Sequence, residues 1–155
     1  MKKLGRFISL IGIFALVLTA TAAWAQPGMG PGGGQGHGWG AGDPYSRMYD
    51  PKTVETLSGE VVSVEKFTPG RRMSYGVHFT LKTEKETIPV HLGPSWFMDK
   101  QAVTIAAGDK VEVTGSRIMY QGKPTIIAAE VKKGGQVLKL RDAAGVPAWA
   151  GQGRR

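Results

Sequence analysis

From Val54 onward, apolar and polar side chains alternate with a period of two in several short runs separated by turn residues. The cleanest run is Ser74–Lys82, which carries a large apolar residue at every second position from Tyr75 to Leu81. Successive side chains of a strand point to opposite faces of a sheet, so this alternation is typical of a half-buried strand. The sequence therefore predicts an all-β domain.

Five strands are expected, with a short helix at Gly93–Gln101 between the third and the fourth, where a proline precedes an apolar cluster. The strands comprise residues 58–67, 74–82, 87–92, 110–118 and 125–131, and a short extended piece follows at 136–141. This order predicts a five-stranded OB-like Greek-key barrel over residues 54–141. Gly59 and Gly115 favour a closed barrel over an open β-sandwich, because strongly coiled strands need glycines or bulges.

The first 25 residues have the three parts of a secretory signal peptide. Lys2, Lys3 and Arg6 form a basic start, an uncharged apolar run follows, and Ala23-Trp24-Ala25 supplies small residues at a cleavage site. We expect cleavage after Ala25 and a periplasmic or secreted protein; the alternative is an uncleaved membrane anchor.

Two irregular segments flank the expected barrel. Residues 26–53 begin with a stretch so rich in glycine and proline that we expect a flexible linker, which contains Met29, His37 and Trp39. The alternative for this stretch is weak metal capture by His37 and Met29. The tail, residues 142–155, is expected to be irregular, with Trp149 packing the C-terminus onto the barrel. Trp96-Phe97-Met98 is expected to close the bottom of the barrel as an apolar plug.

The charge and the cysteine content of the chain limit the kinds of site and partner that it can have. The formal net charge of +8 falls to +5 when the three basic residues of the signal peptide leave, and the chain has no cysteine. Disulfides, thiolate metal sites and cysteine nucleophiles are therefore excluded. A basic exported protein suits an acidic protein, a small anion or anionic lipid; nucleic acid is a partner only if the signal peptide is misread. No catalytic motif is present, so we expect no enzyme.

Basic side chains gather in two predicted loops, those joining the first strand to the second and the fourth to the fifth. OB barrels usually bind ligands on the face of the second and third strands between these loops. The alternative is that the charges only serve solubility. The candidate ligand-binding residues are Lys66, Arg71, Arg72, Arg117, Tyr120 and Lys123.

His78 and His91 form a candidate metal site. A two-residue turn at Glu84-Lys85 places Thr83 opposite Glu86, and the same register places the two histidines directly opposite each other, pointing outward. At that separation two imidazoles can chelate Zn(II), Cu(II) or Ni(II). Two histidines alone are an incomplete metal site, and the further ligands that could approach are methionines of nearby loops (Met73, Met98 and Met119). The alternative is therefore a histidine pair without a ligand.

The chain resembles two groups of exported bacterial proteins. Gly59-Glu60-Val61 and Val111–Gly115 are similar to strands of the periplasmic bacterial OB-fold (BOF) proteins, although Lys82–Glu86 replaces that family's acidic turn. His91-Leu92-Gly93-Pro94-x-Trp96 and Leu140–Trp149 are similar to segments of small OB-like proteins of periplasmic redox and magnetosome systems. These resemblances imply fold and compartment. We expect a non-enzymatic binding or adaptor module, and as the alternative a metal-binding or delivery protein.

Overall fold

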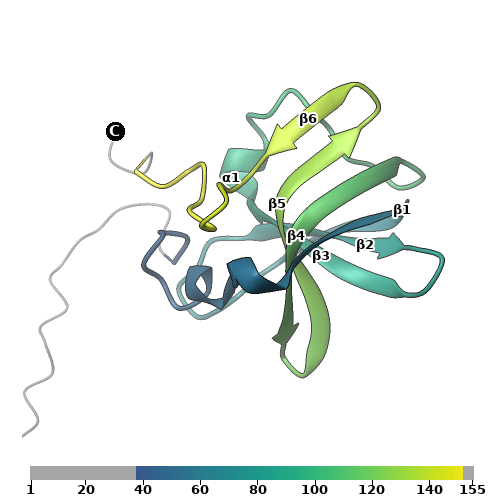
Figure 1. Cartoon of the computed structure of the whole chain (residues 1–155). Coiled ribbons are helices and arrows are strands. Elements are labelled where there is room, and N and C mark those ends of the chain that lie inside the picture. The colour runs from purple at the N-terminus through teal and green to yellow at the C-terminus, as the bar shows by residue number, and fades with distance from the viewer. Residues whose placement is uncertain (1–37, 152–155) are drawn as a thin grey trace, which may run out of the picture. The chain divides into compact units, whose positions relative to one another are not determined.

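A computed structural model describes residues 38–151, which form an all-β domain with very little helix (Figure 1). The predicted signal peptide (1–25), residues 26–37 of the predicted linker and residues 152–155 lie outside the described residues. The elements are η1 (Ser46–Met48), η2 (Pro51–Thr53), β1 (Val54–Phe67), β2 (Gly76–Lys82), β3 (Thr87–Pro94), α1 (Ser95–Met98), β4 (Lys110–Tyr120), β5 (Lys123–Lys133) and β6 (Gln136–Lys139).

The six strands follow the order β3-β2-β1-β4-β5-β6, and neighbours in this order are antiparallel. In addition, β3 and β5 pair in parallel through Val90 with Ile126 and His91 with Ile127. The pairings of β1 to β5 therefore form a closed series. The five predicted strands and the short helix are all present, and the piece expected at 136–141 is a sixth strand, β6, that pairs with β5.

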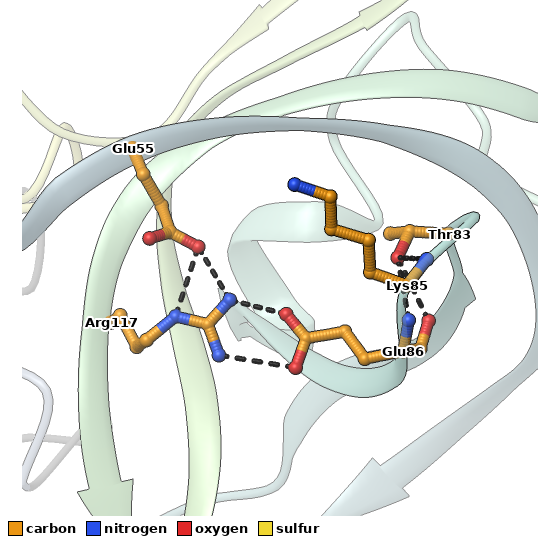
Figure 2. Close-up of polar contacts among 5 residues, drawn as sticks. All are labelled: Glu55, Thr83, Lys85, Glu86 and Arg117. Carbon is orange, nitrogen blue, oxygen red and sulfur yellow. Dashed lines mark hydrogen bonds and ion pairs between the residues drawn. The ribbon is translucent and has the colours of Figure 1, made fainter.

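The hairpin of β2 and β3 has the register predicted from the sequence. Phe79 lies opposite Val90, and Leu81 lies opposite Ile88. The turn is closed by the Thr83 N–H, which donates to the Glu86 carbonyl at 2.8 Å. The Thr83 hydroxyl also accepts from the Glu86 N–H at 3.0 Å (Figure 2). A two-residue loop with this closure fixes which side chains meet across the hairpin.

The interior is filled by the inward residues of the strands, and two glycines let the backbones approach closely. Phe79, Leu81 and Val113 are fully buried. A side chain at Gly59 would collide with the Lys82 carbonyl, and one at Gly115 would collide with the Ile127 carbonyl. The register of β4 and β5 shifts between Thr114 and Gly115, so the strand pair is irregular at this glycine.

The segment 38–53, predicted to be part of a flexible linker, is packed against the sheet. Trp39 is only 1% exposed, and its indole N–H donates to the Ser74 carbonyl at 3.0 Å. Gly76 lies under this ring, since a Cβ added there would come within 2.6 Å of it. Tyr45 and Tyr49 are also buried. The linker prediction was therefore wrong for these residues, because three aromatic rings bury enough apolar surface to order a glycine-rich backbone.

The C-terminal segment packs beside it, as predicted for Trp149. This ring is 3% exposed, and its N–H donates to the Trp39 carbonyl at 2.8 Å. The Arg141 guanidinium lies 4.9 Å from the Trp149 ring centre and donates to the Leu92 carbonyl at 3.0 Å and to the Ala128 carbonyl. Burial lowers the pKa of Arg141 to about 10, so the side chain stays charged at neutral pH.

α1 contributes to the core through Phe97, which is buried, while Trp96 and Met98 are half-buried. The residues predicted to plug the domain thus pack against its core. Within residues 38–151, no helix combines the length and the apolar character needed to cross a membrane.

Candidate functional site

A cavity of about 470 Å³ lies between the β1–β2 loop and the segment 38–53. We call it the loop cavity. Of the predicted ligand-binding residues, Arg71, Arg72 and Tyr120 line it. The remaining lining residues are Gly38, Asp43, Pro44, Tyr45, Met48, Pro69, Gly70 and Met73. Its volume is within the range of natural small-molecule sites.

The β1–β2 loop is held in one shape by three features. The Met73 N–H donates to the Gly70 carbonyl at 3.2 Å, which makes a tight turn at Arg71 and Arg72. Arg72 has a φ of 66°, a left-handed conformation that costs a non-glycine residue about 1–2 kcal/mol. The Tyr120 hydroxyl donates to the Pro69 carbonyl at 3.1 Å, so β4 is tied to the loop. An arginine in a conformation that favours glycine is a sign of a functional position.

The positive charge at the loop cavity comes from two exposed arginines at its rim. Arg71 and Arg72 are exposed, and neither forms an ion pair with another residue between 38 and 151. Asp43 also lines the cavity, but its carboxylate accepts from the Gly40 N–H at 2.5 Å. Burial raises the pKa of Tyr120, so the phenol stays neutral and adds no charge.

The walls of the loop cavity are mainly apolar. Met48 and Met73 are half-buried thioethers, and Pro44 and Pro69 add aliphatic surface. Arginines beside such walls suit a ligand that combines an apolar body with a negative group, because guanidinium matches the planar geometry of carboxylate and phosphate.

Lys66, Arg117 and Lys123 are not part of this cavity. Lys66 lines a separate cavity of about 440 Å³ together with Met98 and other residues between β1, β2 and the α1–β4 connection. Lys123 is exposed at the start of β5, opposite Tyr120. The structure therefore divides the six predicted residues among several places.

Arg117 is fully engaged by two carboxylates (Figure 2). Its Nε donates to Glu55 at 2.9 Å, its Nη1 donates to Glu86 at 3.2 Å, and its Nη2 bonds both residues. These hydrogen bonds raise the pKa of Arg117 and lower that of Glu86. The predicted role of Arg117 in binding a ligand does not fit this arrangement, because its positive charge is already balanced.

His78 and His91 lie opposite each other as predicted, with ring centres 5.7 Å apart. The expectation that both point into solvent was wrong for His91, which is 3% exposed. The segment 38–53 covers it: the Tyr45 hydroxyl lies 2.8 Å from the His91 Nδ1 in a hydrogen bond. Phe67 and Tyr120 contact the same imidazole, with ring centres at 4.2 and 4.9 Å.

Burial, followed by the charges of His78 and Arg141, lowers the pKa of His91 to about 3. Glu65 is a neighbour that sequence reasoning missed; its carboxylate lies 3.5 Å from the His78 Nε2. Glu65 faces His78 across β1 and β2, so a register for that strand pair was the signal needed to find it. Even so, among residues 38–151 no group of three histidine or acidic side chains is placed to hold a metal ion.

Most of the residues that line the loop cavity and that sequence reasoning missed come from the segment 38–53. Tyr45 and Met48 form one wall of the loop cavity. The recurrence of aromatic residues at Trp39, Tyr45 and Tyr49, inside an otherwise glycine-rich stretch, was the available signal. Large aromatic side chains are uncommon in segments that stay disordered.

Comparison with known proteins identifies the family. No curated protein matches the sequence at a significant level. The sequence model of the MamS/MamX magnetosome protein family matches residues 53–138, more than half of the chain. This match confirms the resemblance to magnetosome-associated proteins, whereas the resemblance to BOF proteins stays a prediction. The matched residues include the β1–β2 loop, both histidines and Tyr120, and the chain belongs to the MamS/MamX magnetosome protein family.

Proposed function

We propose that the protein is a non-enzymatic binding or adaptor module that recognises an anionic group through the loop cavity. Membership of a magnetosome-associated family supports a binding or adaptor role. The observation that carries the proposal is the position of Arg71 and Arg72 at the rim of an apolar cavity, where neither cation forms an ion pair with another of residues 38–151.

Three other cations of the described domain are less suited to this role, because they already have acidic partners. Arg117 bonds two carboxylates, Lys132 pairs with Glu112 and Glu130, and Lys133 lies 2.9 Å from Asp109. An incoming anion would have to displace these partners. At the loop cavity, charged hydrogen bonds to an anion would form without that cost, and such bonds are about twice as strong as neutral ones.

The fold supports the same location. We propose that the domain is an OB-like barrel, and the closed series of pairings β1-β2-β3-β5-β4 supports this architecture. The loop cavity lies at the β1–β2 loop and the end of β4, where OB barrels usually bind ligands. On the outer face of β2 and β3, the usual site, the segment 38–53 covers His91.

We also propose that the protein acts outside the inner membrane, in the periplasm. The basis is the order of basic, apolar and small residues in positions 1–25. Mass spectrometry of the protein isolated from its own cells tests this proposal. A mature chain that begins at Gln26 is expected, and a chain that retains Met1 in the cytosolic fraction would contradict it.

Titration with two small anions tests the cavity. We expect benzoate and inorganic phosphate to shift the amide NMR signals of residues 70–73, with affinities that weaken as salt is raised. The double variant Arg71→Gln/Arg72→Asn should weaken binding at least tenfold; asparagine tolerates the left-handed backbone at position 72. The control Lys110→Gln/Lys139→Asn removes the same charge elsewhere. Equal binding by both double variants would refute the proposed site.

A further inference from the structure

We infer that the occupant of the loop cavity is an acidic segment of another protein, which inserts an apolar side chain between the methionines while its carboxylates contact the arginines. This inference rests on the proposed function and specifies the partner's chemistry. The lining supports it, because Met48 and Met73 form an apolar wall next to the two cations.

The two parts of the lining demand two kinds of group in one ligand. A small free anion would use Arg71 and Arg72 but leave the thioethers and prolines in contact with water. A purely apolar segment would fill the cavity but bring its own surface against two arginines without a counter-charge. An acidic segment with an apolar anchor satisfies both parts, and covering apolar surface contributes about 25 cal/mol per Å².

The acidic lining residue restricts where the negative charge of the partner can lie. Asp43 lines the cavity from the segment 38–53, whereas Arg71 and Arg72 line it from the β1–β2 loop. A carboxylate at the tip of the anchor would approach this like charge. The acidic residues of the partner are therefore expected beside the anchor in sequence, where they reach the arginines at the rim.

The neighbourhood of the cavity has the composition of a protein interface. Tyr75, 62% exposed, is the last residue of the β1–β2 loop, and Met119, 61% exposed, precedes Tyr120 in β4. They are the two most exposed large hydrophobic residues between 38 and 151. Tyrosine, methionine and arginine are enriched in interfaces, while lysine and acidic residues are depleted there.

The loop is already ordered before a partner binds. The Tyr120 to Pro69 hydrogen bond and the Gly70 to Met73 turn hold the arginine-bearing loop in place. Preorganisation reduces the entropy lost when a flexible peptide is captured. A short acidic segment therefore needs only one anchor and a few carboxylates to bind measurably.

Selection from a random peptide library tests the inference. The mature protein would be immobilised and panned with random 12-residue peptides displayed on phage. We expect enriched sequences in which aspartate or glutamate flanks phenylalanine, leucine or methionine. A synthetic peptide of that sequence should bind at least tenfold less tightly to Arg71→Gln/Arg72→Asn than to the control Lys110→Gln/Lys139→Asn. Replacing its anchor with glycine should weaken binding by a similar factor. Near-UV circular dichroism of both variants checks that the fold is intact.

The outcomes separate this inference from the proposed function. If phosphate and benzoate bind in an arginine-dependent way but the selection yields no acidic and apolar sequence, the partner inference is wrong and the anion site stands. Enrichment of basic or neutral peptides also overturns the inference. If neither the small anions nor the peptides depend on Arg71 and Arg72, both proposals fail.

Discussion

His91 is the residue whose properties depend most on the rest of the fold. Its imidazole is enclosed by Tyr45, Phe67 and Tyr120, and its stacked partner His78 lies on the neighbouring strand. Taking this ring out of water disfavours its charged form, and the nearby Arg141 guanidinium disfavours it further. The residue is therefore a neutral part of an aromatic cluster, and folding is coupled to its deprotonation.

Acidification should destabilise the protein through His91. Its pKa is about 3 when folded and 6.5 in a model peptide, so the unfolded chain binds more protons between these values. The stabilisation is present above about pH 6.5 and is lost as the pH falls. Between pH 6 and pH 5 the free energy of unfolding should drop by about 1 kcal/mol, measured by urea denaturation. Glu86 and Asp109 have lowered carboxyl pKa values, so both groups titrate below this pH window.

The variant His91→Gln should lose most of this pH dependence, because glutamine can replace the hydrogen bond to Tyr45 but has no titrating group. His78→Gln is the matched control and should keep the slope, since the buried imidazole remains. A His91→Gln variant with an undiminished drop between pH 6 and pH 5 would show that another group is responsible.

At the scale of elements, the strands were predictable and the covering segment was not. The alternation around Phe79 and Val90, together with the turn at Glu84-Lys85, was enough to predict the β2–β3 register, because one slipped residue would place polar side chains in the core. The segment 38–53 has no such periodicity. Its order comes from Trp39 and Tyr45 contacting distant residues, and composition alone describes only local preference. For the same reason the burial of His91 was not predictable.

Trp39 should be as important for stability as a core residue of the sheet. We expect Trp39→Ala to lower the free energy of unfolding by about 3–5 kcal/mol, because removing the indole leaves a large cavity between Gly76 and Phe67. Urea denaturation monitored by circular dichroism measures this change. Tyr75→Ala, at an exposed aromatic side chain, is the control and should change stability by less than about 0.5 kcal/mol. Similar effects of the two substitutions would mean that the segment 38–53 does not contribute to the folded core.

Arg117 connects β4 to β1 and to the β2–β3 turn through Glu55 and Glu86. All three side chains are about one-third exposed, so solvent screens the interaction, and we expect Arg117→Met to cost about 1–2 kcal/mol. A variant that combines Arg117→Met with Glu55→Gln/Glu86→Gln should lose far less free energy of unfolding than the sum of the losses measured for the two sets of substitutions separately. Lys132→Met, at a side chain that is 50% exposed and whose pairs are 3.6 and 3.7 Å long, should cost less than about 0.5 kcal/mol. Additive effects in the Arg117 cycle would show that the network adds nothing to its separate charges.

At the scale of the whole molecule, the folded unit is larger than the region matched by its family. Residues 53–138 contain β1 to β5 and most of β6, but several buried residues lie outside these bounds. They include Trp39, Tyr45, Tyr49, Leu140, Arg141 and Trp149. Both flanking segments pack on the sheet and on each other, so the sheet alone exposes a large apolar surface.

A chain limited to residues 53–138 should therefore not unfold cooperatively, whereas one of residues 38–151 should. Near-UV circular dichroism and thermal melting distinguish them. The shorter chain is expected to lose its aromatic signal and to bind a hydrophobic dye, as loosely packed states do. A cooperative melt of the shorter chain within a few degrees of the longer one would show that the flanking segments are dispensable.

The contact between Trp39 and Trp149 also determines when the protein can finish folding. One ring belongs to the start of the described chain and the other to its end, and the indole N–H of Trp149 donates to the carbonyl of Trp39. During synthesis, Trp39 is made more than 100 residues before Trp149, with which it forms this contact. β1 is likewise made before β4, the strand with which it pairs. The aromatic core that these two rings share cannot close before Trp149 has been synthesised, so we expect the packing of the two flanking segments to be a late step of folding.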